Sequence, residues 1–104
     1  MIVFDIYTVY YERPTTGFTF LQRDDLTVAD LEKTHALVKK GLRASSKDAV
    51  FTKMQGEYWS PEGQAIPLIK SLGLQHTSMS VNDVLCDPQG GFWQCMNLGW
   101  RKIT

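Results

Sequence analysis

Residues 81–98 read VNDVLCDPQGGFWQCMNL, and this stretch decides the fold class. Apolar residues dominate positions 81–86 and again positions 92–98, which predicts two β-strands. The tetrapeptide DPQG between them has proline second and glycine fourth, the composition of a type I turn. The stretch therefore predicts an antiparallel hairpin, and a last short strand is expected over residues 100–103.

Two cysteines, Cys86 and Cys95, lie on the two arms of this predicted hairpin. With the turn at DPQG, Cys86 lies opposite residue 91 or 92 and cannot reach Cys95. A two-residue turn at residues 90–91 would instead place the two cysteines face to face. The first register is favoured because Pro88 has no N–H to donate inside a ladder. We therefore expect two buried free thiols, with a disulfide or a thiol-bound metal as the alternatives.

The N-terminal part of the chain also carries strand signals. Residues 2–12 are dense in β-branched and aromatic side chains on both alternating faces, which predicts a strand covered on both sides. Residues 17–22 resume the signal after a proline-containing break, so the two segments predict a hairpin with a long loop. A further strand is predicted over residues 49–59.

Two helices are predicted between these strands. The first spans residues 28–42: Thr27 is a good N-cap, apolar residues recur at helical spacing with His35 among them, and acids precede bases along the segment. Gly41 is expected to mark its last turn. The second begins at Ser60, followed by proline at the first helical position, and closes at Gly73. Pro67 is expected to kink this helix or to begin its stable part.

The resulting order is β-β-α-β-α-β-β, an α+β fold with two helices and a mostly antiparallel sheet. With 104 residues, 43% of them apolar, the chain is expected to form one domain over residues 1–104. The N-terminus has no basic segment of a signal peptide, and no apolar run approaches the length of a membrane span. We therefore expect a cytoplasmic protein without a membrane partner.

The net charge is zero, with 11 basic and 11 acidic residues, and this balance makes a dedicated nucleic-acid binder less expected. The best hint of nucleic-acid binding is the basic end of the predicted first helix, together with aromatic residues that stack on bases. These residues are Lys39, Lys40, Arg43, Lys47, Tyr7, Tyr11 and Trp59. The surplus of Trp and Tyr equally suits a protein interface.

Catalytic motifs are scarce. His76 precedes several hydroxyl residues and Asp83, a composition compatible with nucleophilic catalysis, but no G-x-S-x-G elbow is present. The competing interpretation is that Ser78, Ser80 and their neighbours satisfy backbone groups in a turn. We therefore expect no catalytic residue, no metal site and no cofactor, and we expect His35 to be a packed core residue.

The segment LGLQHTSMSVNDVL (residues 72–85), followed by Leu98-Gly99-Trp100, resembles the H-S-L-S-V-x-D-V segment and downstream G-[FW] of YodL-like domains. Those small domains occur in proteins of plasmids, phages and integrative elements. The resemblance covers the last third of the chain and brings no established activity. Ser80 and Asp83 explain the string structurally, because both side chains hydrogen-bond the backbone well at a strand entrance.

These observations together predict a small accessory protein of a phage or mobile genetic element that acts by binding another protein. A nucleic-acid partner and a homodimer stay open as alternatives. The predicted binding residues are Tyr11, Lys39, Lys40, Arg43, Lys47, Trp59 and His76.

Overall fold

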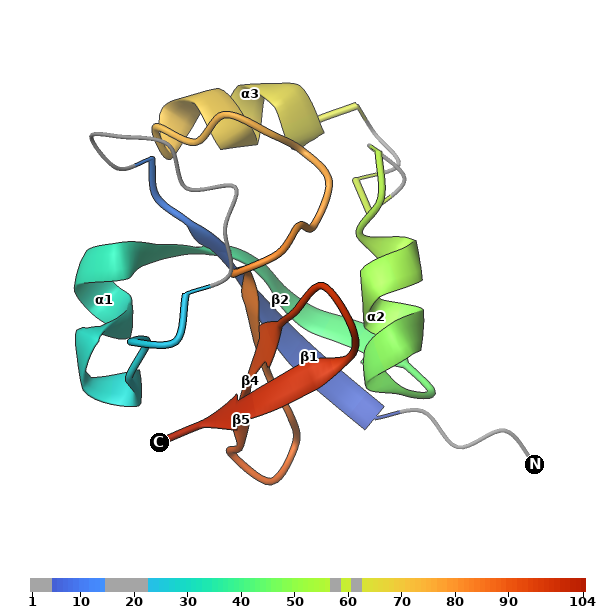
Figure 1. The fold of residues 1–104 in the computed structure, drawn as a ribbon. Helices are drawn as coiled ribbons and strands as arrows, with labels where there is room; N and C mark the ends of the chain where they lie inside the picture. The colour runs from blue at the N-terminus through green and yellow to red at the C-terminus, as the bar shows by residue number, and fades with distance from the viewer. Residues whose placement is uncertain (1–4, 15–22, 57–58, 61–62) are drawn as a thin grey trace.

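The computed structural model describes residues 5–14, 23–56, 59–60 and 63–104, and over these it forms one five-stranded antiparallel sheet with three α-helices (Figure 1). The strand order is β2-β1-β3-β4-β5, so β2 and β5 are the two edges of the described sheet. The predicted α+β class with an antiparallel sheet is therefore confirmed. The elements are β1 (Asp5–Glu12), a 3-10 turn η1 (Val28–Asp30), α1 (Leu31–Thr34), β2 (His35–Ala44), α2 (Lys47–Lys53), α3 (Ala65–Ser71), β3 (Val84–Cys86), β4 (Phe92–Cys95) and β5 (Trp100–Ile103).

The predicted hairpin is confirmed as β3 and β4, in the register expected from the DPQG turn. Cys86 pairs with Phe92, and the Gly90 N–H donates to the carbonyl of Asp87 at 3.1 Å. Both cysteines are free thiols, as predicted, but only Cys95 is buried, whereas Cys86 is half-buried. Burial, with smaller contributions from nearby carboxylates, raises the pKa of the Cys95 thiol to about 11, so this thiol stays protonated and unreactive at neutral pH.

β1 is an interior strand of the sheet, and it pairs with β2 on one side and with β3 on the other. Tyr7, Val9 and Tyr11 are buried on one face, in the core that α2 and α3 cover. The other face is covered only in part, since Ile6 is 54% exposed. A second buried cluster on this face joins β3 and β5 to the segment around α1: Leu26, Leu31, Val84 and Ile103. The predicted strand at residues 17–22 lies outside the described residues.

The predicted helix over residues 28–42 is wrong beyond its first turns. Helical structure ends at Thr34, and β2 follows directly as the antiparallel neighbour of β1. The ladder with β1 shifts register twice, and each shift inserts an extra residue into β2. The inserted residues break the alternation of buried and exposed side chains that a regular strand shows. The buried positions of β2 therefore recur at spacings that imitate a helix.

The predicted strand over residues 49–59 is also wrong, because residues 47–53 form α2. Ser46 caps this helix: its side chain accepts a hydrogen bond from the Ala49 N–H at 3.1 Å. The second predicted helix is confirmed as α3, but it begins at Ala65 rather than at Ser60. Pro67 therefore lies in the first turn, where its missing N–H costs no intrahelical bond.

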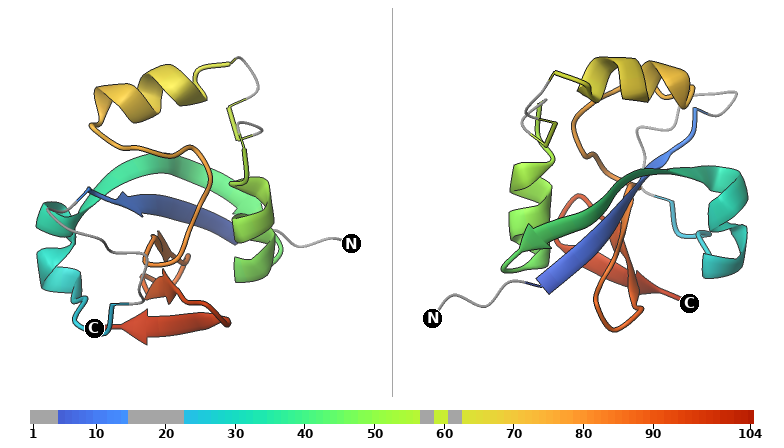
Figure 2. Two further views of the ribbon diagram at one scale, coloured as in Figure 1. Left: turned by 45° about the horizontal axis from the view of Figure 1, so that its top comes forward. Right: turned by 180° about the vertical axis from the view of Figure 1, so that it is seen from behind.

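The helices surround β2 on several sides. Figures 1 and 2 show α1 and α2 at opposite ends of β2, whereas α3 lies over one face of the sheet. The α3 helix is followed by Leu72 and then by Gly73, whose φ of 72° is the left-handed conformation common just after a helix C-terminus, so the closing role predicted for this glycine is confirmed. In the described part of the chain, no helix is long and apolar enough to cross a membrane.

Candidate functional site

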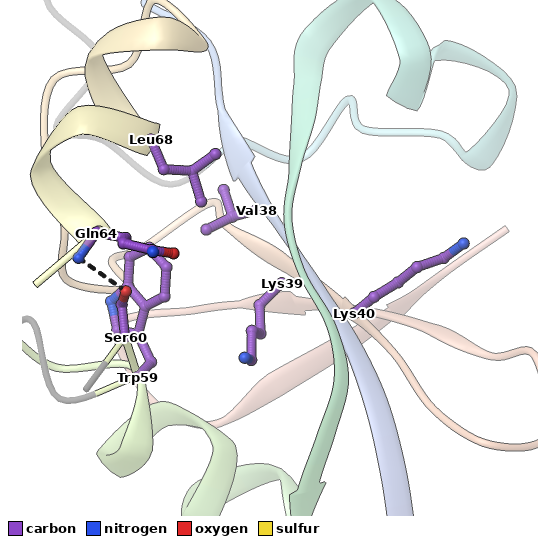
Figure 3. Close-up of a pocket in the computed structure, with 7 residues that line it drawn as sticks. All are labelled: Val38, Lys39, Lys40, Trp59, Ser60, Gln64 and Leu68. Carbon is purple, nitrogen blue, oxygen red and sulfur yellow. Dashed lines mark hydrogen bonds between the residues drawn. The ribbon is translucent and has the colours of Figure 1, made fainter. Parts of the chain in front are cut away.

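A pocket of about 460 Å³ opens between the edge strand β2 and the start of α3 (Figure 3). Three chain segments supply its walls: the middle of β2, the residues before α3, and the first turns of α3 itself. The lining residues are Val38, Lys39, Lys40, Trp59, Ser60, Gln64 and Leu68. The pocket thus combines an apolar wall with polar and cationic groups, the composition typical of a binding site.

A bulge in β2 gives the pocket its cation. Val9 of β1 pairs with Lys39, but the next residue, Tyr10, pairs with Leu37, so Val38 is extra in the ladder. As a result, the consecutive side chains of Val38 and Lys39 both point toward the pocket, whereas Lys40 points away from it (Figure 3). A regular strand would send Val38 and Lys39 to opposite faces.

A second irregularity lies just beyond, where Tyr7 pairs with Leu42 while Val9 pairs with Lys39. Gly41, inside this shift, has a φ of 70° and no heavy atom within 4 Å of where a Cβ would be. The left-handed conformation, and not crowding, therefore calls for glycine at this position. The bulges at residues 38 and 41 together determine the direction in which the Lys39 side chain points.

The apolar wall rests on a buried hydrogen-bonded hub. Trp59 is only 6% exposed, and its indole N–H donates to the carbonyl of Thr77 at 2.9 Å. The Tyr11 hydroxyl donates to the same carbonyl at 2.7 Å, and it lies 3.3 Å from the carbonyl of Met54. Burial raises the pKa of Tyr11 further above its ordinary value, so the hydroxyl keeps its proton.

This hub corrects the expectation that Tyr7, Tyr11 and Trp59 form a surface on which bases stack. All three are buried. Tyr11 and Trp59 hold the segment around Thr77 to the core, and Trp59 also lines the pocket. The aromatic residues proposed for stacking are thus structural.

The structure brings three of the seven predicted binding residues together at the pocket: Lys39 and Trp59 face it, and Lys40 borders it although its side chain points away. Arg43 is exposed near the end of β2, and its carbonyl accepts from the Lys53 ammonium at 2.7 Å. Lys47 instead lies over the Trp93 ring, 4.2 Å from its centroid.

His76, the remaining predicted binding residue, packs against the core rather than the pocket. Its ring stacks on Tyr11 with centroids 5.2 Å apart, and its Nδ1 lies 2.8 Å from the carbonyl of Ser78. A carbonyl only accepts, so Nδ1 carries the hydrogen in this contact. Nδ1 of His76 therefore faces the main-chain carbonyl of Ser78 and not its hydroxyl.

Four pocket residues were not predicted from the sequence: Val38, Ser60, Gln64 and Leu68. The sequence did single out Ser60, but as the N-cap of a helix and not as a pocket residue. Its hydroxyl does accept from the Gln64 N–H at 3.1 Å, but this turn precedes α3 rather than starting it. In the sequence, Val38 and Leu68 cannot be told from apolar residues of the core. Only the folded structure shows that they line the pocket.

The segment that resembles YodL-like domains serves as a structural connector in this fold. The Asp83 carboxylate is fully buried and accepts from the N–H groups of Ser80 at 2.7 Å and Glu12 at 2.8 Å. The Ser78 hydroxyl accepts from the Gly56 N–H at 2.7 Å. The predicted role of Ser80 and Asp83 at a strand entrance is thus confirmed. Burial raises the pKa of Asp83 well above its ordinary value.

Among the described residues, no three His, Cys, Asp or Glu side chains lie close enough together to hold a metal ion. Comparisons with known protein families, with curated proteins and with solved structures find no match to this chain. The function is therefore inferred from the pocket and the residues around it.

The buried His35 makes the fold sensitive to acid. The Nε2 atom lies 2.8 Å from the carbonyl of Asn82, so Nε2 carries the hydrogen, and Nδ1 lies 2.7 Å from the Thr34 hydroxyl. Burial lowers the pKa of His35 below its ordinary 6.5. Below about pH 6.5 the unfolded chain therefore binds more protons than the folded one, and stability falls as the pH falls.

We predict that the stability advantage of the wild type over His35→Gln shrinks between about pH 7.5 and pH 5.5, by at most about 1.4 kcal/mol per pH unit. Glutamine still reaches the Asn82 carbonyl but does not titrate. Glu12 and Asp83, whose pKa values are raised by burial, act in the opposite direction, but both chains contain them. Urea unfolding at each pH measures the difference, and a constant difference would contradict the assignment.

Proposed function

We propose that this chain is a small accessory protein of a phage or mobile genetic element that acts in the cytoplasm by binding another protein. The pocket between β2 and α3 is the observation that carries the proposal. The resemblance of residues 72–85 to YodL-like domains supports the biological setting. The proposed ligand is a short extended segment of the partner.

Strand addition is the mode of binding that this geometry favours. In the described sheet β2 has a neighbour on one side only, and it is ten residues long. An extended segment that lies along the edge of a sheet gains main-chain hydrogen bonds, and pockets beside that edge select its side chains. Here the pocket lies directly beside the middle of β2, where Val38 and Lys39 point into it.

Selection of short random peptides by display on the folded protein tests the proposal. We expect bound peptides to shift the NMR resonances of Val38, Ser60, Gln64 and the Trp59 indole. Leu68→Ala should weaken these peptides about tenfold, because a buried apolar contact is worth roughly 1–2 kcal/mol. Leu98→Ala is the matched control, because Leu98 is 93% exposed and lies beside β5 at the opposite edge.

Four results would count against peptide binding in the groove. Failure to select any peptide would remove the proposal, as would peptides that shift resonances only outside the pocket. Binding of single-stranded oligonucleotides, with an affinity that falls as salt is added, would favour the nucleic-acid alternative. A concentration-dependent dimer that shifts the pocket resonances would identify a second copy of the chain as the occupant.

A further inference from the structure

Charge is unevenly placed on this chain, whose net charge is zero. On β2 and α3, the two elements that flank the pocket, every charged Lys, Arg, Asp or Glu side chain is positive. They are Lys39, Lys40 and Arg43 on β2 and Lys70 on α3. The carboxylates on the neighbouring strand, Asp5 and Glu12, pair with residues at the two ends of β2, whereas Lys39 lies at its middle. Lys39 and Lys40 are the charged residues among those described as lining the pocket, so this described lining is basic on a neutral protein.

Lys39 is the cation that points into the pocket. In the described part of the chain both ion pairs use Arg23, with Glu12 and Asp25 as its partners, so no described carboxylate pairs with Lys39. Its side chain is half-buried beside Val38, and across the pocket lie the hydroxyl of Ser60 and the amide of Gln64 (Figure 3). A half-buried ammonium beside apolar groups attracts a carboxylate more strongly than a fully solvated one does.

We propose that the segment bound in this groove is acidic, and that an aspartate, a glutamate or a C-terminal carboxylate enters the pocket and pairs with Lys39. This inference rests on the proposed peptide-binding function. The aliphatic part of the ligand side chain packs on Val38, Trp59 and Leu68, and the carboxylate meets the ammonium. Lys40 and Arg43, also on β2, attract further acidic residues of the segment and speed its encounter with the groove.

The test begins with the peptides selected by display. We expect them to be enriched in Asp, Glu or a free C-terminus at one position. Exchange of that acid for its amide should weaken binding about tenfold, the usual effect of losing a hydrogen bond to a charged group. Lys39→Gln should weaken the acidic peptide by a similar factor and leave the amide peptide nearly unchanged.

Two control variants separate pairing from other effects. Lys39→Arg keeps the positive charge and should retain most of the affinity for the acidic peptide. Lys33→Gln removes a charge from α1, outside the pocket lining, and should leave the affinity unchanged. Calorimetric titration of each variant, with circular dichroism to confirm folding, gives the comparison.

The outcomes distinguish this inference from the function on which it rests. Peptides that bind in the pocket without acid preference, or an acidic peptide that Lys39→Gln does not weaken, would overturn the acidic ligand while peptide binding stands. Recovery of no peptide at all would overturn both. Lys39-dependent binding of oligodeoxythymidine, with no peptide bound, would also overturn both and assign the basic groove to phosphate.

Discussion

Replacement of Asp83 by alanine is expected to lower the free energy of unfolding by about 2–4 kcal/mol, since it leaves two partly buried N–H groups without acceptors. Those donors are the backbone groups of Ser80 and Glu12, which the carboxylate joins across the β1–β3 boundary. Relief from burying a charge offsets part of the loss. Urea unfolding followed by tryptophan fluorescence measures the effect.

Two further variants sharpen this prediction. Asp83→Asn keeps one accepting oxygen but turns an amide N–H₂ toward the second donor, so we expect a smaller loss than for alanine. Asp30→Ala removes an exposed carboxylate that accepts a hydrogen bond from the Thr27 hydroxyl at the surface, and it should stay near wild-type stability. A chain with Asp83→Ala that is as stable as the wild type would contradict the structural role.

Replacement of Trp59 by alanine is expected to cost about 3–5 kcal/mol, the usual range for deleting a large buried aromatic side chain. Trp59→Phe keeps most of the packing and removes only the indole N–H, so we expect a loss of about 1 kcal/mol. Trp100→Phe is the matched control, because its indole N–H donates to Asp48 at the surface. Unfolding is best followed by far-ultraviolet circular dichroism, since the variants change the fluorescence.

The shared carbonyl of Thr77 makes this prediction more specific. Either Tyr11→Phe or Trp59→Phe alone leaves Thr77 with one donor, whereas the double variant removes both. We therefore expect the double variant to lose more stability than the sum of the single losses, by about 0.5 kcal/mol or more. Additive losses would show that the two donors do not depend on the same acceptor.

Part of the candidate site was within reach of the sequence. Lys39, Lys40 and Trp59 were singled out for their residue types, and all three line the pocket. The positions predicted for them are wrong, because the lysines lie in the middle of β2 rather than at a helix end and Trp59 is buried rather than exposed. Tyr11 and His76 were predicted to bind a partner, but Tyr11 is buried and the half-buried ring of His76 stacks on it. Residue type indicated the chemistry, whereas position depended on the folded chain.

The sequence by itself determined those features that depend on residues close to one another in the chain. The DPQG turn fixed the register of Cys86 opposite Phe92, and with it the separation of the two thiols. The hydrogen bond from the Ser80 N–H to Asp83 and the left-handed residue Gly73 after α3 were likewise predictable, because each depends on neighbours within a few residues.

Only the tertiary structure decided the conformation of residues 35–44. In isolation their buried positions fit a helix, but β1 offers them a ladder of hydrogen bonds and a place in the core. The two bulges that make this pairing irregular also turn Lys39 into the pocket. Contacts distant in sequence outweigh local preference when they bury more apolar surface and satisfy more backbone groups, and here they set both the fold and the site.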